Sequence, residues 1–350
     1  MKVLFGLGHP AHFHLFKNTI NTLVKEGNEI VIIINDKDIL SRLLDDSGLP
    51  YFTLTRKGAK DSLFVKLKRL LRGVKETRRL IKEEKPDVIA GCINEIAFAS
   101  LFNNIPVLFF AEDDFRYTWL QGILIYPFVT RIISPVPVNV GPFRFKKESY
   151  NGYQKLAYLH PLWFKPDRIK VRNTQEPYFI IRLVGMSAYH DIGQKGMDST
   201  IVPEIIGMLE KHGRVYVTSE KSFEGGLQKY RLDHNPSDMH HYLCYASMFI
   251  SDSQSMSIEA ALLGTPNIRI SDFAGRVSVL EQLEKKYGLT AGFKPTEKDK
   301  IMARISEWLN DNELQDKFAA RREIMLKDMI DVAGFITERI LFYGGKNKNR

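Results

Sequence analysis

Residues 251–269 read SDSQSMSIEAALLGTPNIR, and this stretch decides the fold. A short apolar run, Met248 to Ser251, predicts a strand, and the small residues after it favour a turn and a helix N-cap. A helix is predicted from Met256 to Leu263, until Gly264-Thr265-Pro266 ends it and a further strand begins. The order strand, turn, helix, turn, strand is typical of an α/β protein.

The first turn of the predicted helix is a candidate anion site. Its backbone N–H groups have no partner within the helix, and the helix macrodipole places partial positive charge there. The hydroxyls of Ser253, Ser255 and Ser257 would add donors. Glu259 follows one turn later, where a carboxylate can accept two hydrogen bonds from vicinal hydroxyls such as those of a ribose. The alternative is a capped surface helix with an incidental glutamate.

This stretch resembles the nucleotide-binding segment of GT-B-fold proteins, and most closely the Asp-Ser-Gly-Gly…Glu-Ala…Leu-Gly-x-Pro pattern of the non-hydrolysing UDP-N-acetylglucosamine 2-epimerases. The whole chain resembles a bacterial and archaeal family related to those epimerases and to GT-B glycosyltransferases, specifically in its C-terminal half and loosely in its N-terminal half. The resemblance implies a nucleotide-diphosphate sugar, most simply a UDP-sugar, bound in an interdomain cleft. Gln254 and Ser255 stand where the epimerases carry two glycines, so the diphosphate is expected to bind in a different pose.

Length and composition predict two domains. The chain has 350 residues, 44% of them hydrophobic, which is enough for two ordinary cores. Short β-rich runs alternate with helical segments in both halves, which predicts two doubly wound, Rossmann-like domains with parallel sheets. We expect an N-terminal domain on the acceptor side over residues 1–160 and a nucleotide-sugar-binding domain over 161–325. A C-terminal helix over 326–350, with a disordered polar tail from Gly344, is expected to pack back toward the first domain.

The cysteines and the N-terminus predict a cytoplasmic protein. Cys92 and Cys244 are the two cysteines, which favours reduced thiols over a disulfide framework, and no Cys/His spacing of a zinc site occurs. The chain begins with a predicted strand and no signal-peptide pattern, and no apolar run reaches the roughly 20 residues of a membrane span. We expect neither a metal ion nor an organic cofactor.

The net charge of +9 has a local source. The segment from Lys60 to Lys85 contains ten Lys or Arg residues and four acidic residues, and its apolar residues recur at helical spacing. The simplest interpretation of this amphipathic helix is a stripe packed on the core under a solvated basic face. The functional alternative is attachment to anionic lipid headgroups at the inner membrane face, where the acceptor would be lipid-linked. A nucleic-acid partner is not expected, because no nucleic-acid-binding motif accompanies the charge.

Ligands of open parallel sheets bind beyond the carboxyl ends of the strands, so the loops there hold the candidates. After the first strand come His9, His12 and His14. By the resemblance, His12 matches the base proposed for the peptidoglycan lipid-linked N-acetylglucosaminyltransferase, and it could deprotonate an acceptor hydroxyl. His9 falls where the epimerases have the arginine of an Arg-Pro pair. The alternatives are a histidine metal site and imidazoles that cap or pack the first helix.

Two further loops of the first half carry candidate groups. Cys92 stands where the resemblance places a catalytic aspartate of the epimerases, and a thiol cannot simply replace that carboxylate. Glu112, Asp113 and Asp114 follow the fifth predicted strand, and Glu112 aligns loosely with a catalytic glutamate of the epimerases. Adjacent acids repel one another, so at least one is expected to have a raised pKa and to serve as a general acid or base. The alternatives are an acidic metal site and a loop paired with nearby bases.

The second half supplies basic candidates for phosphate and sugar. Arg182 ends a predicted strand, where a guanidinium could grip a phosphate. By the resemblance, His190 matches the histidine with which the epimerases contact the UDP phosphates. Arg269 lies on the strand after the 251–269 helix and Arg276 in the loop beyond it, and both could face the sugar. Ordinary surface ion pairs are the alternative.

Three function classes share this predicted site. The first is a metal-independent, inverting glycosyltransferase of surface polysaccharide or glycoconjugate synthesis, in which His12 or one of the three acids activates the acceptor and the helix N-terminus stabilises the leaving diphosphate. The second is a UDP-N-acetylglucosamine 2-epimerase, which the thiol at Cys92 disfavours. The third is a nucleotide-sugar-binding protein without catalysis, for which the Gln254-Ser255 turn is the main argument.

Overall fold

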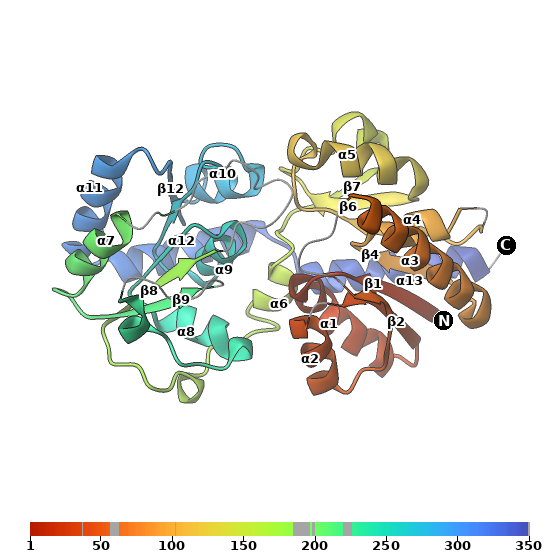
Figure 1. The fold of residues 1–350 in the computed structure, drawn as a ribbon, viewed down its shortest axis with the longest axis horizontal. Coiled ribbons are helices and arrows are strands. Elements are labelled where there is room, and N and C mark those ends of the chain that lie inside the picture. Colours follow the sequence, from red (N-terminus) through yellow and green to blue (C-terminus); the bar gives the residue numbers. More distant parts are fainter. Residues whose placement is uncertain are drawn as a thin grey trace. The chain divides into compact units, whose positions relative to one another are not determined.

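The computed structural model describes residues 1–36, 38–56, 63–101, 103–184, 197, 200–219 and 226–348. The chain forms two compact units (Figure 1). Unit 1 comprises Met1–Tyr158 and Ile330–Arg350, and unit 2 comprises Leu159–Met329. Each unit is built around one parallel sheet, and the two are described separately below.

Unit 1 contains a seven-stranded sheet in the order β3-β2-β1-β4-β5-β6-β7. Every adjacent pair of strands is parallel. The strands are β1 (Lys2–Leu7), β2 (Glu29–Asp36), β3 (Tyr51–Arg56), β4 (Val88–Gly91), β5 (Val107–Phe110), β6 (Arg131–Pro135) and β7 (Lys147–Tyr150). The inner strands of this sheet are largely apolar and have little exposed surface, as expected for a sheet that is covered on both faces. The strand order reverses beside β1, which is where such sheets bind ligands.

Helices cover both faces of this sheet. They are α1 (Pro10–Lys25), α2 (Asp38–Ser47), α3 (Leu63–Glu84), α4 (Asn94–Ala99), α5 (Phe115–Ile125) and α13 (Val332–Lys348), with short 3₁₀ turns η1 (Tyr126–Phe128) and η2 (Gly141–Lys146). The short helix α6 (Leu156–Leu159) spans the boundary between the two units. The connections through α3, α4 and α5 all advance toward β6, so right-handed crossovers put these three helices on one face. Helix α4 packs against both α3 and α5, whereas α13 packs against α1, and the Thr19 hydroxyl donates 3.2 Å to the Ala333 carbonyl.

Unit 2 contains a five-stranded parallel sheet in the order β12-β11-β10-β8-β9. Its strands are β8 (Tyr178–Leu183), β9 (Arg214–Ser219), β10 (Met248–Ser251), β11 (Asn267–Ile270) and β12 (Ala291–Phe293). Its helices are α7 (Ile201–Leu209), α8 (Met239–Tyr245), α9 (Gln254–Leu263), α10 (Ser278–Lys285), α11 (Lys298–Leu309) and α12 (Leu314–Asp328), with 3₁₀ turns η3 (Arg168–Lys170), η5 (Leu227–Tyr230) and η6 (Pro236–Asp238). The predicted class, two doubly wound parallel α/β sheets, is therefore confirmed.

Some predicted boundaries were wrong. Helix α9 begins at Gln254, before the predicted Met256, because Ser253 caps it. The C-terminal helix that was predicted over 326–350 is α13, which begins at Val332, whereas residues up to Asp328 belong to α12. Helix α13 continues to Lys348, so the polar segment from Gly344 that was expected to be disordered is helical up to that residue.

Candidate functional site

The N-terminus of α9 lies at the carboxyl edge of the unit 2 sheet, beside two arginine-bearing strands. Ser251, the last residue of β10, pairs in register with Arg182 of β8 on one side and with Arg269 of β11 on the other. Arg269 in turn pairs with Gly292 of β12. The carboxyl edge is where open parallel sheets bind ligands, so the expected phosphate site has its basic residues in the adjoining strands.

The first turn of α9 retains donors for an anion. The Ser253 hydroxyl accepts a hydrogen bond from the Met256 N–H at 3.2 Å, and the Ser251 hydroxyl accepts one from the Ser253 N–H at 2.7 Å. The N–H groups of Gln254 and Ser255 have no hydrogen-bond partner among the described residues. Ser257 differs from the expectation, because its side chain is fully buried and its hydroxyl cannot reach a ligand at the helix end.

The Gln254 side chain is bonded to β11 and the loop after it. Its Oε1 accepts a hydrogen bond of 2.6 Å from Nη1 of Arg269, and its Nε2 donates one of 2.9 Å to Oγ of Ser271. Arg269 has no exposed surface, so the structure contradicts the expectation that this residue faces a bound sugar. Burial lowers the pKa of its guanidinium. The carboxylates of Glu284 and Glu281 act in the opposite direction, since each has an oxygen 4.0 Å from Nη2 of Arg269.

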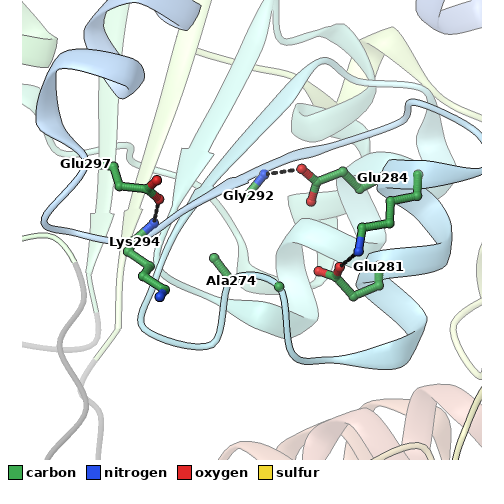
Figure 2. Close-up of a pocket in the computed structure, with 8 residues that line it drawn as sticks. Ala274, Glu281, Glu284, Gly292, Lys294 and Glu297 are labelled. Carbon is green, nitrogen blue, oxygen red and sulfur yellow. Dashed lines mark hydrogen bonds and ion pairs between the residues drawn. The ribbon is translucent and has the colours of Figure 1, made fainter.

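A cavity of about 220 Å³ lies beside this cluster (Figure 2). It is lined by residues of β12, α10 and the neighbouring loops, namely Ala274, Gly275, Glu281, Glu284, Lys285, Gly292, Lys294 and Glu297. Its carboxylates already have partners: Glu284 accepts from the Gly292 N–H at 3.1 Å, Glu297 from the Lys294 N–H at 2.9 Å, and Glu281 pairs with Lys285 at 2.7 Å. Among the residues that the structure describes, no three His, Cys, Asp or Glu side chains form a group that could hold a metal ion.

Glu259 lies on the second turn of α9 and faces α8. Its Oε1 is 3.4 Å from Nε2 of His240, and the two side chains are 12% and 14% exposed. This carboxylate is nearly buried but retains some exposed surface, and it lies one turn beyond N–H groups that have no partner in the described part of the chain. His240 escaped the sequence reasoning because its partner is 19 residues away in the chain.

Asp252 is a second residue that sequence reasoning did not single out. Its Oδ1 accepts a hydrogen bond of 2.9 Å from the Val184 N–H, which ties the end of β8 to the end of β10. Only 7% of the residue is exposed, and burial raises the pKa of its carboxyl to about 6. Its position directly after a buried strand was the available signal.

The remaining predicted residues of unit 2 are less closely grouped. Arg182 is half-buried at the end of β8. Arg276 is exposed in the turn after β11, where its N–H donates 3.1 Å to the Phe273 carbonyl. His190 lies outside the described residues.

In unit 1, two of the three histidines after β1, His9 and His12, accept hydrogen bonds from backbone N–H groups. Nδ1 of His9 accepts from the Ala11 N–H at 3.2 Å, and His9 is the N-cap of α1. Nδ1 of His12 accepts from the Gly8 N–H at 3.0 Å. A backbone N–H can only donate, so neutral His12 carries its proton on Nε2 and presents a donor there. This geometry does not support His12 as the base that takes the acceptor proton.

The three acids after β5 diverge rather than cluster. Glu112 forms a nearly buried ion pair with Lys155 and accepts from the Gln154 N–H at 2.9 Å. Asp114 is buried and its Oδ1 accepts from the Asn139 N–H at 2.9 Å, so its carboxylate holds a turn. Asp113 is exposed. The expected mutual repulsion is therefore relieved by separate partners, and Asp114 is corrected to a structural residue.

Cys92 follows β4, and burial, reinforced by the Glu112 charge, raises the pKa of its thiol. A thiol in that state is protonated at neutral pH and is a poor base. Both Cys92 and Cys244 are free thiols.

The first half of α3 does not pack on the core as the simplest interpretation expected. Phe64 is 76% exposed and Leu71 is 62% exposed, and the bases between them are also on the surface. The buried apolar side chains Leu80 and Ile81 lie in the second half of the helix. Helix α5, on the same face of the sheet, exposes Trp119, Leu120, Ile123 and Leu124. No described helix has the length and apolar character needed to cross a membrane.

Proteins of known sequence resemble this chain over most of its length. A model of the family described as "Protein of unknown function (DUF354)" matches residues 1–333. The UDP-N-acetylglucosamine--N-acetylmuramyl-(pentapeptide) pyrophosphoryl-undecaprenol N-acetylglucosamine transferase of Clostridium novyi is 21% identical over 287 residues, 77% of each chain. The protein of the same name from Clostridium botulinum (strain Langeland) is 22% identical over 236 residues, 65% of this chain and 64% of that protein, so the match spans a little under two thirds of that relative.

Solved structures share the architecture. The UDP-GlcNAc 2-epimerase from Neisseria meningitidis bound to UDP-GlcNAc has a TM-score of 0.70 at 15% identity, over 98% of this chain and 100% of that one. The MurG structure from Acinetobacter baumannii has a TM-score of 0.61 at 14% identity, over 97% of this chain and 99% of that one. At such identities the likeness concerns the fold, which is of the GT-B type in both comparisons.

Proposed function

The chain belongs to the DUF354 family, and from this membership and the geometry of its site we propose that it is a GT-B glycosyltransferase that uses a nucleotide-diphosphate sugar, most simply a UDP-sugar. The observation that carries the proposal is the first turn of α9. The N–H groups of Gln254 and Ser255, which have no partner among the described residues, lie at the carboxyl edge of the sheet, and Glu259 follows one turn later. The helix end would bind the diphosphate and stabilise it as it leaves, while Glu259 holds the ribose hydroxyls.

We assign donor binding to unit 2 and acceptor activation to unit 1. Of the predicted bases, Asp113 is the carboxylate that is exposed. It would take the proton of the acceptor hydroxyl as that oxygen attacks the anomeric carbon and the nucleotide diphosphate departs. His12 would donate a hydrogen bond through Nε2 rather than accept a proton. No step requires a metal ion, in keeping with the resemblance to GT-B enzymes.

The acceptor is proposed to be lipid-linked, in surface polysaccharide or glycoconjugate synthesis at the inner membrane face. Support comes from α3, where exposed apolar side chains such as Phe64 and Leu67 alternate with exposed bases such as Lys66 and Lys68. A helix of this composition can bury its apolar face in the headgroup region while its bases meet anionic lipid. Helix α5, which packs against α4 as α3 does, exposes apolar side chains as well.

A 2-epimerase is the second candidate, favoured by the likeness to epimerase structures and opposed by the protonated thiol of Cys92. A binding protein without catalysis is the third, and its argument is the side chain at Gln254. The first test is calorimetric titration with UDP, GDP, CMP and dTDP sugars. We expect UDP-sugars to bind, and failure of the whole panel would contradict all three candidates.

The second test separates the candidates. UDP-N-acetylglucosamine incubated alone in deuterium oxide should keep its configuration and its hydrogen at C2 if the protein is a transferase. Formation of the manno epimer with deuterium at C2 would instead establish the epimerase. If the protein binds the sugar nucleotide but neither epimerises it nor transfers the sugar to an acceptor in a lipid extract, the binding protein without catalysis is the remaining candidate.

A further inference from the structure

Gln254, the first residue of α9, is held on both sides of its amide. Nη1 of Arg269 donates to its Oε1 at 2.6 Å, and its Nε2 donates to Oγ of Ser271 at 2.9 Å. Arg269 has no exposed surface and Ser271 has almost none. Buried partners in a low-dielectric setting have little freedom to move, so the Gln254 side chain is fixed toward β11.

Arg269 is itself fixed between the sheet and α10. Its Nη2 lies 4.0 Å from one carboxylate oxygen each of Glu281 and Glu284. A Cβ atom on Gly292, the register partner of Arg269, would lie 2.6 Å from Nη2 and 3.0 Å from Oε2 of Glu284. The guanidinium therefore occupies the space that a side chain at residue 292 would need.

The hydrogen bonding of this guanidinium is directed at one residue. Nε and Nη2 of Arg269 are buried without a hydrogen-bond partner in the described part of the chain, and Nη1 bonds Gln254. Burying a charged group costs free energy unless the group is paired and well hydrogen-bonded. An arginine whose one hydrogen bond there goes to the first residue of α9 points to a role at that helix end.

We propose that Arg269 is a positioning residue of the diphosphate site: it holds the Gln254 side chain toward β11 and thereby keeps it off the N–H groups of Gln254 and Ser255. This inference rests on the proposed function. It also accounts for the departure from the Gly-Gly turn of the epimerases. A glycine needs no restraint, whereas a glutamine at the mouth of a phosphate site does.

The test is the affinity for UDP, measured by calorimetry on four proteins: wild type, Arg269→Met, Gln254→Gly and the double variant. Releasing Gln254 in Arg269→Met should weaken UDP binding about tenfold or more, whereas Gln254→Gly removes the side chain, keeps the backbone N–H groups and should bind UDP more tightly than Arg269→Met. The double variant should return to the affinity of Gln254→Gly, because no side chain remains to obstruct the turn. A stability defect of Arg269→Met would not be repaired by removing Gln254.

Three outcomes would overturn the inference. Unchanged UDP affinity in folded Arg269→Met would show that Arg269 does not restrain Gln254. A double variant that binds UDP as weakly as Arg269→Met would show another role for the arginine. Weak binding by Gln254→Gly alone would mean that the amide itself contacts phosphate. If Arg269→Met does not fold, Arg269→Gln with and without Gln254→Gly gives the same comparison, because the shorter side chain cannot hold Gln254 as the guanidinium does, and wild-type affinity in folded Arg269→Gln would then overturn the inference.

The failure of the proposed function has a different signature. A wild-type protein that binds neither UDP nor any sugar of the panel would overturn the proposed function together with this inference. If the wild type binds UDP and a folded Arg269 variant binds it with the same affinity, only the inference about Arg269 is overturned.

Discussion

Nε2 of His240, on α8, lies 3.4 Å from Oε1 of Glu259, on α9. The contact joins neighbouring helices and orients a carboxylate whose side chain is 12% exposed. This orientation supports the proposal that Glu259 binds the ribose hydroxyls. The first prediction follows from this pair.

Glu259→Ala should abolish measurable nucleotide-sugar binding while leaving the fold intact. Losing two charge-assisted hydrogen bonds to ribose removes about 2–4 kcal/mol of binding free energy. Titration calorimetry with UDP-N-acetylglucosamine measures the change, and circular dichroism checks the fold. Glu307→Ala, a change at a 64% exposed glutamate of α11, is the matched control and should bind as wild type. Equal affinities of the Glu259 and Glu307 variants would remove Glu259 from the site.

The ion pair of Glu112 and Lys155 should contribute to the stability of unit 1. The two side chains are 12% and 8% exposed, so removing the ammonium leaves a carboxylate largely without water or counter-charge. Lys155→Met should lower the free energy of unfolding by about 3–5 kcal/mol, and adding Glu112→Gln should recover most of that loss. Calorimetric unfolding measures both effects. Lys82→Met, at an exposed lysine of α3, controls for the loss of charge alone. A double variant no more stable than Lys155→Met would contradict the pairing.

Asp252 predicts a pH dependence of stability. Burial raises the pKa of its carboxyl from 3.8 to about 6, so the folded state holds this proton more tightly than the unfolded state does. Stability therefore falls as pH rises from about 4 to 6, and Asp252→Asn, which keeps the acceptor for the Val184 N–H, escapes that fall. The variant should equal wild type below about pH 4 and exceed it by up to about 3 kcal/mol above pH 6.

Urea unfolding of Asp252→Asn and wild type across this pH range measures the difference. Asp316→Asn, at an exposed aspartate of α12, should show no such divergence. A constant difference at every pH would mean that the carboxyl of Asp252 does not titrate between the two states in this window.

The sequence was most informative where local chemistry determines structure. Gly264 ends α9 as predicted, because a left-handed glycine acts on the adjacent backbone, and the N-cap Ser253 lies in the run of small residues where a cap was predicted. The edge strands β7 and β12 were not predicted, since one is polar and the other has three residues. Contacts between distant residues were also beyond reach. Nothing near Arg269 in the sequence indicates full burial, because its partners Glu281 and Glu284 come from the next helix.

The last prediction concerns α3. If its exposed face meets an anionic membrane, the protein should co-sediment with phosphatidylglycerol vesicles at low salt and dissociate as salt rises, because screening weakens the attraction. Changing Lys66, Lys68, Arg72 and Lys75 to Gln should remove most of the binding, at about 1 kcal/mol for each base. These bases are exposed, whereas Arg78 donates 3.1 Å to the Phe98 carbonyl and Arg79 pairs with Glu76 and Glu83, so the latter two are left intact.

The matched control changes four exposed bases of unit 2, Lys165, Lys211, Arg214 and Lys327, to Gln. It lowers the net charge equally, so it should retain binding if the α3 face is the contact and lose it if net charge alone attracts the protein. Phe64→Ser with Leu71→Ser tests the apolar component, which should weaken binding even at high salt, where electrostatic attraction is screened. Negligible sedimentation of wild type at low salt would leave α3 as a solvated helix and favour an acceptor that is not embedded in a membrane.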